Sequence, residues 1–508
     1  MRSLRPLAAG ACLALAALAS GAAAPAAARA QSRAELARVI RRLVMNNGLE
    51  VVVVENHSVP LATVQIDVKN GSYTQSPDYA GLAHMYEHMF FKASRDYPAP
   101  DEFTQRLGEL GAVFNATTQE EDVSYYITLP SDSARTAMEA MASAVRSPLF
   151  RDDELAREKE VVLGEYDRNQ SGPGFDFQQE MTRRLYPGSF SRKNVIGDRE
   201  VLRTVTPDKM REIQRRYYVP NNSALVVTGD VRPDSVFAWA ARYFGGWARA
   251  ADPFQTNPIP PIAPLAADQG VIAAAPVSAT TVLVQWQGPS VRRDRASTYA
   301  ADVLSDALNT EGSRFQRRLV DSGLWQGVLA NYYTLDQKGP ITFSGQPAPG
   351  RAKEALEALF DEVEHLADPG YFSADELQAV KAQRTMGSAL GVEKTSSLTH
   401  TVGFWWAVAD IEYFMGYNDN MAQQTPEDLR RYAATYLVGR PRVTGVLLPS
   451  GERSRFPFRE QDLAVFWRDV VANRPAPKAV APAPPVRRGT RRPATAAAAA
   501  ATTGGENN

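Results

Sequence analysis

Two histidines and a glutamate lie within five consecutive residues, His84-Met85-Tyr86-Glu87-His88, although the whole chain has only five histidines. Residues four apart share one face of a helix, so both imidazoles can reach a single point, and Glu87 lies close to that face. Two imidazoles beside a carboxylate are typical of a helix that presents a catalytic zinc ion and its general base. The stretch therefore predicts part of a zinc centre.

A third ligand must come from elsewhere, because two histidines alone do not hold a catalytic zinc ion. The order H-x-x-E-H is the inverted form of the commoner H-E-x-x-H metallopeptidase motif. Further along, Glu158 and Glu165 are seven residues apart, so they share a face of a predicted helix over residues 152–168. Periodicity does not show whether Glu165 meets the histidines, since an acidic residue on such a helix usually points to solvent.

The composition is that of a globular protein, with 508 residues, 44% hydrophobic and 22% charged residues and a formal net charge of −1. This charge gives no argument for a nucleic-acid partner or an anionic membrane. The single cysteine, Cys12, lies in an N-terminal apolar run. A chain without that run has no thiolate, so histidine, glutamate or aspartate must hold any zinc ion.

Residues 1–30 have the pattern of a signal peptide: a basic start, an uncharged Ala/Leu-rich run, and Ala28-Arg29-Ala30 as a cleavage site. The pattern predicts secretion or export to the periplasm, with no membrane span left after cleavage, and an uncleaved membrane anchor is the alternative. Residues 474–508 contain almost no large apolar residue and predict a disordered tail.

The remaining chain alternates apolar strand patterns with helical periodicity, and the order repeats after a Pro-rich linker at 250–268. The predicted strands are 44–55 (a hairpin or strand start), 61–68, 113–118, 122–129, 223–228, 271–275, 280–287, 323–333, 340–345 and 443–448. The predicted helices are 33–42, 81–93, 101–110, 131–145, 152–168, 207–218, 234–244, 297–309, 352–366 and 374–389. The sequence thus predicts an α+β fold with two similar α/β-sandwich lobes, 31–249 and 269–473, each a mainly antiparallel sheet packed with helices.

Several segments of the first half follow one family's pattern. They are Asn70–Ser72, Gly81–Met89, Asn115–Thr118 with Tyr125-Tyr126, Glu158–Glu165, Tyr218–Asn222 and Gly229-Asp230. With these segments the half resembles the pitrilysin (insulinase) family of zinc metallopeptidases, especially its bacterial and mitochondrial-processing-peptidase-like branch. In that family a downstream glutamate completes the zinc site and another glutamate precedes it by seven residues, as Glu165 and Glu158 do here.

The resemblance implies a metalloendopeptidase that hydrolyses peptides or small unfolded proteins, built as a clam of two lobes. His84, His88 and Glu165 would bind Zn²⁺, Glu87 would be the general base, and Glu158 would orient a ligand from behind. The non-catalytic alternative is a binding or assembly subunit of a related complex, but such a subunit has no need of Glu87. A purely structural zinc site is weaker still, because such sites close all four positions with protein ligands.

The resemblance also implies that substrate adds a strand to a sheet edge, where Asn115 and Ala116 match the family pattern. The alternative for Asn115 is an ordinary turn residue.

The second half lacks a zinc motif of its own, since Tyr299–Val303 stands at the corresponding place without histidine. Its His365 and His400 stand alone and are expected to be solvated or packed. Trp405 and Trp406 are expected in the core or between the lobes rather than as a substrate platform.

Active family members often carry an Arg and a Tyr, seven apart, in the second lobe, where they hold substrate and stabilise the oxyanion. Here Leu319 and Gln326 occupy these two places, while Arg318 and Trp325 have the right separation one residue out of register. The pair is therefore predicted to be absent. The resemblance then implies a dimer with a related chain that supplies the pair, and favours a heterodimer.

Overall fold

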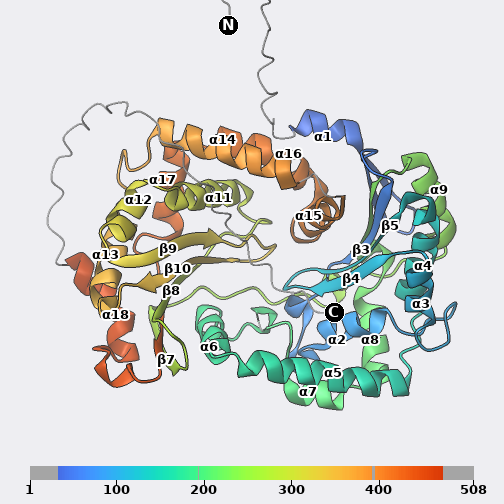
Figure 1. The fold of residues 1–508 in the computed structure, drawn as a ribbon, viewed down its shortest axis with the longest axis horizontal. Helices are drawn as coiled ribbons and strands as arrows, with labels where there is room; N and C mark the ends of the chain where they lie inside the picture. Colours follow the sequence, from blue (N-terminus) through green and yellow to red (C-terminus); the bar gives the residue numbers. More distant parts are fainter. Residues whose placement is uncertain (1–31, 193, 392–394, 473–508) are drawn as a thin grey trace, which may run out of the picture. The chain divides into compact units, whose positions relative to one another are not determined.

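The computed structural model describes residues 32–192, 194–391 and 395–472 (Figure 1). The predicted signal peptide at 1–30 and the predicted tail at 474–508 lie outside this part of the chain. The strands are β1 (Ile40–Val44), β2 (Glu50–Glu55), β3 (Leu61–Val68), β4 (Val113–Thr118), β5 (Val123–Pro130), β6 (Ser223–Gly229), β7 (Gln269–Ala275), β8 (Thr281–Gln287), β9 (Trp325–Tyr332), β10 (Pro340–Pro347) and β11 (Val443–Pro449).

Helices connect these strands in both halves of the chain. The α-helices are α1 (Arg33–Val39), α2 (Leu82–Phe90), α3 (Glu102–Glu109), α4 (Ala134–Arg146), α5 (Asp152–Ser171), α6 (Phe175–Leu185), α7 (Arg199–Thr204), α8 (Pro207–Tyr217), α9 (Pro233–Phe244), α10 (Pro253–Thr256), α11 (Arg295–Asn309), α12 (Arg314–Gln316), α13 (Ala352–His365), α14 (Ala374–Gly391), α15 (Thr395–Val408), α16 (Ile411–Gln423), α17 (Pro426–Tyr436) and α18 (Glu460–Ala472). No helix in the described ranges is both long and apolar enough to cross a lipid bilayer.

The strands form two sheets with the same internal order. The first sheet runs β1-β2-β6-β3-β5-β4 and the second runs β7-β11-β8-β10-β9. In each sheet one pair is parallel, β2 with β6 and β7 with β11, and the other pairs are antiparallel. The second sheet therefore repeats the first without β1, which confirms the predicted α+β fold with two similar lobes.

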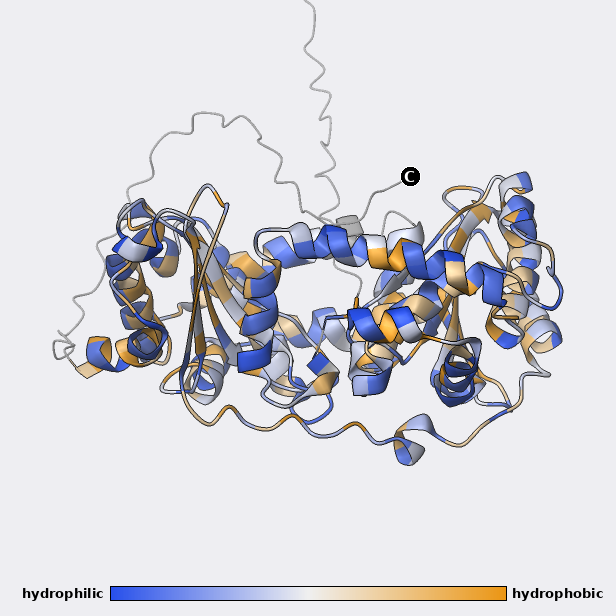
Figure 2. Ribbon diagram, turned by 90° about the horizontal axis from the view of Figure 1, so that it is seen from below, coloured by the Kyte–Doolittle hydropathy of each residue, from blue (hydrophilic) through white to orange (hydrophobic). Residues whose placement is uncertain are grey.

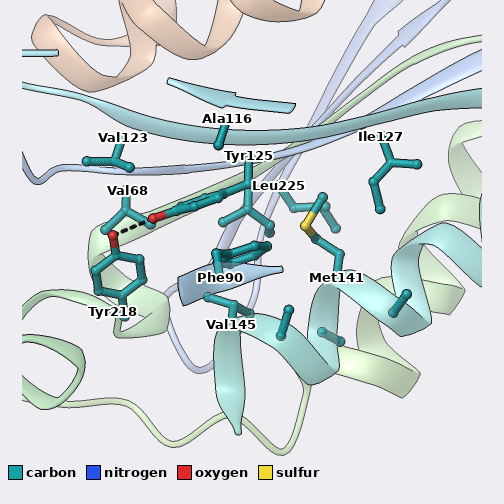
Figure 3. Packing of buried hydrophobic residues seen from close by; sticks show 14 of the residues in the cluster. Val68, Phe90, Ala116, Val123, Tyr125, Ile127, Met141, Val145, Tyr218 and Leu225 are labelled. Carbon is teal, nitrogen blue, oxygen red and sulfur yellow. Dashed lines mark hydrogen bonds between the residues drawn. The ribbon is translucent and has the colours of Figure 1, made fainter. Parts of the chain in front are cut away.

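Alternation along β3 gives the first sheet two different buried faces. Val64, Ile66 and Val68 belong to the core that the sheet shares with helices α2 and α4. Figure 3 shows this core, in which Phe90 of α2 stacks on Tyr125 of β5. The Tyr125 and Tyr218 hydroxyls form a hydrogen bond at 2.7 Å, so these two buried phenols are each other's partners.

The opposite face of each sheet is covered by a helix from the other half. Helix α15 packs on β3 and β6, and helix α6 packs on β7 and β11. Two glycines allow the close approach. A Cβ on Gly403 of α15 would lie 2.3 Å from Asp67 Oδ1, and a Cβ on Gly445 of β11 would lie 2.3 Å from Met181 Sδ of α6. The two halves thus exchange helices.

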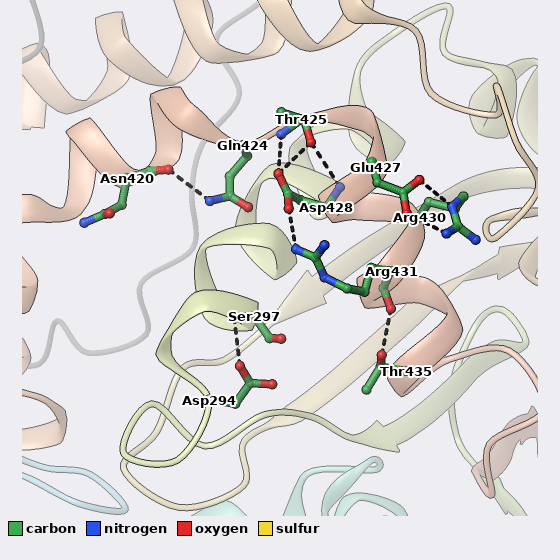
Figure 4. Close-up of polar contacts among 10 residues, drawn as sticks. All are labelled: Asp294, Ser297, Asn420, Gln424, Thr425, Glu427, Asp428, Arg430, Arg431 and Thr435. Atoms are coloured by element: carbon green, nitrogen blue, oxygen red, sulfur yellow. Dashed lines mark hydrogen bonds and ion pairs between the residues drawn. The ribbon is translucent and has the colours of Figure 1, made fainter.

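The structure corrects the predicted first helix. It ends at Val39 rather than residue 42, because Ile40–Val44 pair with β2 as an edge strand. The helices that were not predicted are α6, α7, α10, α12, α15, α16, α17 and α18. Figure 4 shows why α17 begins at Pro426: the Thr425 hydroxyl accepts the Asp428 N–H at 3.2 Å, and the Asp428 carboxylate accepts the Thr425 N–H at 2.9 Å.

Side-chain polarity follows the faces of these elements. In Figure 2 blue and orange residues alternate around the helices, and orange residues are interspersed with paler and blue ones in the strands. Such amphipathic helices bury one face against a sheet and expose the other, which is the layer arrangement expected of an α+β protein.

Candidate metal centre

Helix α2 presents the two histidines from its first and second turns. Its N-cap Gly81 has φ of 93°, and a Cβ there would lie 2.6 Å from the Ile196 carbonyl oxygen, so only glycine fits. Leu82, Met85 and Met89 are buried in the core of the first lobe. This anchoring directs the opposite face of α2 toward helix α5, which α2 contacts.

Glu165 of α5 meets both histidines. Its Oε2 atom lies 3.6 Å from Nε2 of His84 and 3.6 Å from Nε2 of His88. The two rings stand edge to face with centroids 4.8 Å apart. Within the described ranges this trio is the one group of three or more His, Cys, Asp or Glu side chains close enough to share a metal ion, with its ligand atoms within 4.8 Å of one another.

These separations fit a zinc ion. Tetrahedral zinc with bonds of about 2.1 Å places its ligand atoms about 3.4 Å apart. Two imidazole nitrogens and one carboxylate oxygen are ligands that zinc accepts, and three protein ligands leave a fourth position for solvent or substrate. The residues present therefore suit a catalytic zinc ion.

Glu158 supports the site from behind His88, on the face of α5 that it shares with Glu165. Its Oε2 lies 3.2 Å from Nδ1 of His88, and Lys92 Nζ lies 2.7 Å from its other oxygen. An imidazole that donates its Nδ1–H to a carboxylate keeps Nε2 free for a metal. Lys92 was missed in the sequence, although it follows His88 by four residues within the helix predicted over residues 81–93. In the structure α2 ends at Phe90, so Lys92 reaches Glu158 from just beyond the helix.

Without a metal the two histidines differ in charge. Burial, and then the nearby His88, lower the pKa of His84 to about 4. Burial also opposes protonation of His88, but its contacts with Glu158 and Glu165 outweigh burial and raise its pKa to about 9. A cation entering the site must therefore displace a proton from His88.

Glu87 is positioned from another element. The Thr118 hydroxyl at the end of β4 donates to Glu87 Oε2 at 2.6 Å. Burial raises the pKa of Glu87, while the Thr118 hydrogen bond and His88 act against that rise. Thr118 belongs to a segment that matches the family pattern, but nothing in its spacing indicates contact with Glu87.

Asn115 and Ala116 lie on β4, at the edge of the first sheet. Asn115 is exposed and pairs with Tyr126 in the register with β5, so it is a strand residue and not a turn residue. Its side-chain oxygen accepts the Ala116 N–H at 2.9 Å. The structure thus places both residues at an unpaired edge within the described sheet, beside the strand end that contacts Glu87.

The second lobe offers no arginine–tyrosine pair at the aligned places. Leu319 is fully buried in the second core, and Gln326 is exposed on β9. Arg318 and Trp325 have the spacing of the pair but stand one residue out of register. Arg318 lies 3.5 Å from Asp361, and the buried Trp325 donates its indole N–H to the Ala355 carbonyl.

The isolated residues of the second lobe have structural contacts. His365 lies beside Asp368, and His400 contacts Gln65 at 2.7 Å. Trp406 is buried in the cluster between α15 and the first sheet, and Trp405 packs partly against it.

Comparison with known families assigns both halves. Residues 50–195 match insulinase (peptidase family M16), and residues 204–384 match the peptidase M16 inactive domain. The chain belongs to the M16 peptidase family. The description of the second match agrees with a second lobe whose described residues hold no metal-ligand cluster.

Curated relatives of this M16 chain include two bacterial proteins named as uncharacterized zinc proteases. The protein from Streptomyces coelicolor is 24% identical over 80% of this chain and 89% of its own length. The protein from Bacillus subtilis is 23% identical over 71% of this chain and 86% of its own length. Relatives with these names identify the M16 chain as similar to zinc proteases.

Solved structures share the fold. A protease from Helicobacter pylori superposes with a TM-score of 0.72 at 21% identity, covering 81% of this chain and 99% of that chain. The first half of the periplasmic protease PqqL from Escherichia coli superposes with a TM-score of 0.73 at 18% identity, covering 87% and 98%. These matches establish the two-lobe M16 architecture.

Proposed function

We propose that this chain is a zinc-dependent metalloendopeptidase that hydrolyses peptides or small unfolded proteins. One observation carries the proposal: His84, His88 and Glu165 converge on a single point, and Glu87 stands on the same helix as both histidines. The similarity to proteins named zinc proteases supports the choice of metal and of reaction.

His84, His88 and Glu165 would hold the ion, and Glu158 would keep the Nε2 atom of His88 directed at it. A bound zinc ion would supply Lewis acidity that makes water a nucleophile near neutral pH. Glu87 would take the proton from the attacking water and deliver it to the leaving amine. Its burial suits this role, because burial brings the pKa of a carboxyl closer to neutrality.

Substrate would add a strand along β4, where Asn115 and Ala116 lie. The incoming strand would have to displace the Asn115 side chain from the Ala116 N–H before it could pair with that group. A peptide bound in this way would run beside Glu87, because the same strand ends at Thr118.

The substitution Glu87→Gln tests the proposal. We expect the variant to keep its zinc content and to lose turnover by about 100- to 10,000-fold, the usual contribution of a general base. Zinc analysis and peptide cleavage are the measurements. Glu160→Gln on the exposed face of α5 makes the same chemical change away from the centre and should match the wild type. Full turnover in Glu87→Gln would refute the general-base role.

We further propose that activity requires a related chain that bears the missing arginine and tyrosine, since Leu319 and Gln326 stand at those places. A non-catalytic subunit is the competing function. Peptide cleavage in the presence of zinc and a partner that bears the arginine and tyrosine distinguishes the two functions. A non-catalytic subunit would stay inactive under these conditions.

A secreted or periplasmic location is also proposed. The pattern of residues 1–30 supports export, and so does the similarity to a solved protease described as periplasmic.

A further inference from the structure

The turn after β4 connects Glu87 with the second lobe. Thr118, the last residue of β4, is 8% exposed and donates its hydroxyl to Glu87 at 2.6 Å. The orientation of the Glu87 carboxylate therefore depends on where this strand ends. The next three residues, Gln119, Glu120 and Glu121, form the start of the turn that leads to β5.

The first lobe holds one side of this turn through the backbone. The Tyr73 N–H donates to the Glu120 carbonyl at 2.9 Å, and the Ser72 N–H donates to the Gln119 carbonyl at 3.4 Å. Gly71 has φ of 142°, and a Cβ there would lie 2.3 Å from the Gln119 carbonyl oxygen. Only glycine allows the two segments to approach this closely.

The second lobe holds the other side through side chains and backbone. The Tyr333 hydroxyl lies 3.0 Å from Gln119 Oε1 and 3.2 Å from Glu120 Oε2, and its one proton is shared between these two acceptors. The backbone N–H groups of Asp336 and Gln337 both donate to the Glu121 carboxylate, that of Gln337 at 3.2 Å. The three donor residues, Tyr333, Asp336 and Gln337, belong to the loop between β9 and β10.

Glu121 is the most deeply buried part of this contact. Its side chain is 1% exposed, and that of its ion-pair partner Arg192 is 3% exposed, at 2.7 Å. A buried carboxylate is tolerated only when its lone pairs are filled, and here Arg192 and two backbone N–H groups of the second lobe fill them. Separating the loop from the turn would leave this charge short of donors, so the contact is held closed.

We propose that the loop Tyr333–Gln337 of the second lobe positions the general base of the first lobe. The loop fixes the turn Gln119–Glu121, the turn fixes Thr118, and Thr118 fixes the Glu87 carboxylate. Thr118, Glu121 and Tyr333 are therefore positioning residues. The expected loss of kcat rests on the proposed peptidase function. The expected loosening of the turn does not. The proposal also assigns the second lobe a part in the reaction that needs no metal ligand.

Variants of the full-length chain, loaded with zinc and assayed with its partner, test the proposal. Thr118→Val removes the hydroxyl and keeps the shape, so kcat should fall about 10- to 100-fold while KM and zinc content stay near those of the wild type. Thr118→Ser restores the hydroxyl and should recover most of kcat. Wild-type kcat in Thr118→Val overturns the proposal, as does a loss that Thr118→Ser fails to reverse.

Tyr333→Phe has a matched control in its neighbour. Tyr332 donates its hydroxyl to the Pro289 carbonyl within the second lobe and does not touch the turn. Tyr333→Phe should lower kcat several-fold and speed amide hydrogen exchange at residues 117–122, whereas Tyr332→Phe should change neither. Equal effects of the two variants overturn the proposal.

The exchange measurement needs no turnover. If the wild type, loaded with zinc and assayed with its partner, cleaves no peptide, the proposed function fails, and exchange at residues 117–122 still decides the positioning role. Faster exchange in Tyr333→Phe than in Tyr332→Phe supports the role, and unchanged exchange in Tyr333→Phe refutes it.

Discussion

Helices α2 and α11 occupy equivalent places in the two lobes but use them differently. In α2, histidines and a glutamate converge with the carboxylates of α5, and Lys92 is the one lysine or arginine that ion-pairs with this group within the described ranges. In α11, Asp302 accepts the Tyr417 hydroxyl at 2.6 Å, and Arg384 donates to Tyr417 at 2.9 Å. The second network pairs its groups with one another, whereas the first places two imidazoles and a carboxylate at the spacing of metal ligands.

Aromatic packing completes the contrast. Tyr299 of α11 stacks on Tyr413 of α16, with ring centroids 4.8 Å apart, so side chains fill the space beside α11. At the corresponding face of α2, His88 and the facing Glu165 of α5 keep partly exposed side chains. One scaffold therefore serves chemistry in the first lobe and packing in the second.

Removing a ligand should produce the largest effect. Glu165→Ala deletes the one carboxylate in the described part of the chain that meets both histidines, so zinc should be lost and peptide cleavage should fall by at least about 1,000-fold. Asp302→Asn in the second lobe is the matched control and should keep both zinc and activity. Metal analysis and cleavage assays check the contrast; zinc retained in Glu165→Ala would contradict the ligand set.

The addition of a partner chain should have the second-largest effect on activity. Adding a related chain that carries the arginine and tyrosine should raise kcat by about 100- to 1,000-fold, the usual value of an oxyanion donor. A partner with both residues replaced by alanine is the control. Full activity of the isolated chain as a monomer would show that its own second lobe suffices.

Glu158 should contribute less than a ligand. Glu158→Gln weakens the hydrogen bond to His88 and should reduce zinc affinity about 10- to 100-fold. Competition with a chelator measures this change. Glu154, on the same helix but bonded to the Ala93 N–H, provides the control Glu154→Gln, for which an equal loss of affinity would argue against a specific role of Glu158.

The smallest predicted effect concerns the exchanged helices. Helix α6 lies over apolar residues, whereas the contact of α15 with the first sheet also contains buried polar groups, Asp67 and Gln65, the second of which contacts His400 of α15. Burial raises the pKa of Asp122 beside these groups to about 7, against the opposing charge of Lys69. The folded chain therefore keeps this proton between about pH 4 and 7 while the unfolded chain releases it, so stability falls as pH rises through that window.

Asp122→Asn should remove this dependence. The variant should gain unfolding free energy over the wild type at pH 8 and gain less at pH 4. Denaturant unfolding at both pH values checks it, and an equal effect at the two values would contradict the assignment.

Much of the centre was predictable from spacing. The four-residue interval between His84 and His88 predicts convergence on one helical face, and the structure shows it. The meeting with Glu165 was not predictable from periodicity, because it depends on how α5 packs on α2. It followed only from the resemblance. The contact of Lys92 could have been predicted, because Lys92 follows His88 by four residues within the predicted helix. The contact between Thr118 and Glu87 could not, because it depends on where β4 ends.

The fold followed from strand and helix patterns, but the helix exchange did not. Phe177, Met181 and Leu185 of α6 are four apart and mark an apolar face. Nothing in that period says which sheet the face covers. The domain limits at residues 31, 249, 269 and 473 stay predictions.

The exchange of α6 and α15 makes the two lobes a single cooperative particle. Each sheet depends on the other half for its cover, so neither half is a self-sufficient module. A protease that cuts the linker between residues 257 and 263 would leave a nicked molecule whose pieces stay together. In the proposed dimer, a gate for substrate would lie between this chain and its partner, because opening this chain on itself would expose both sheets.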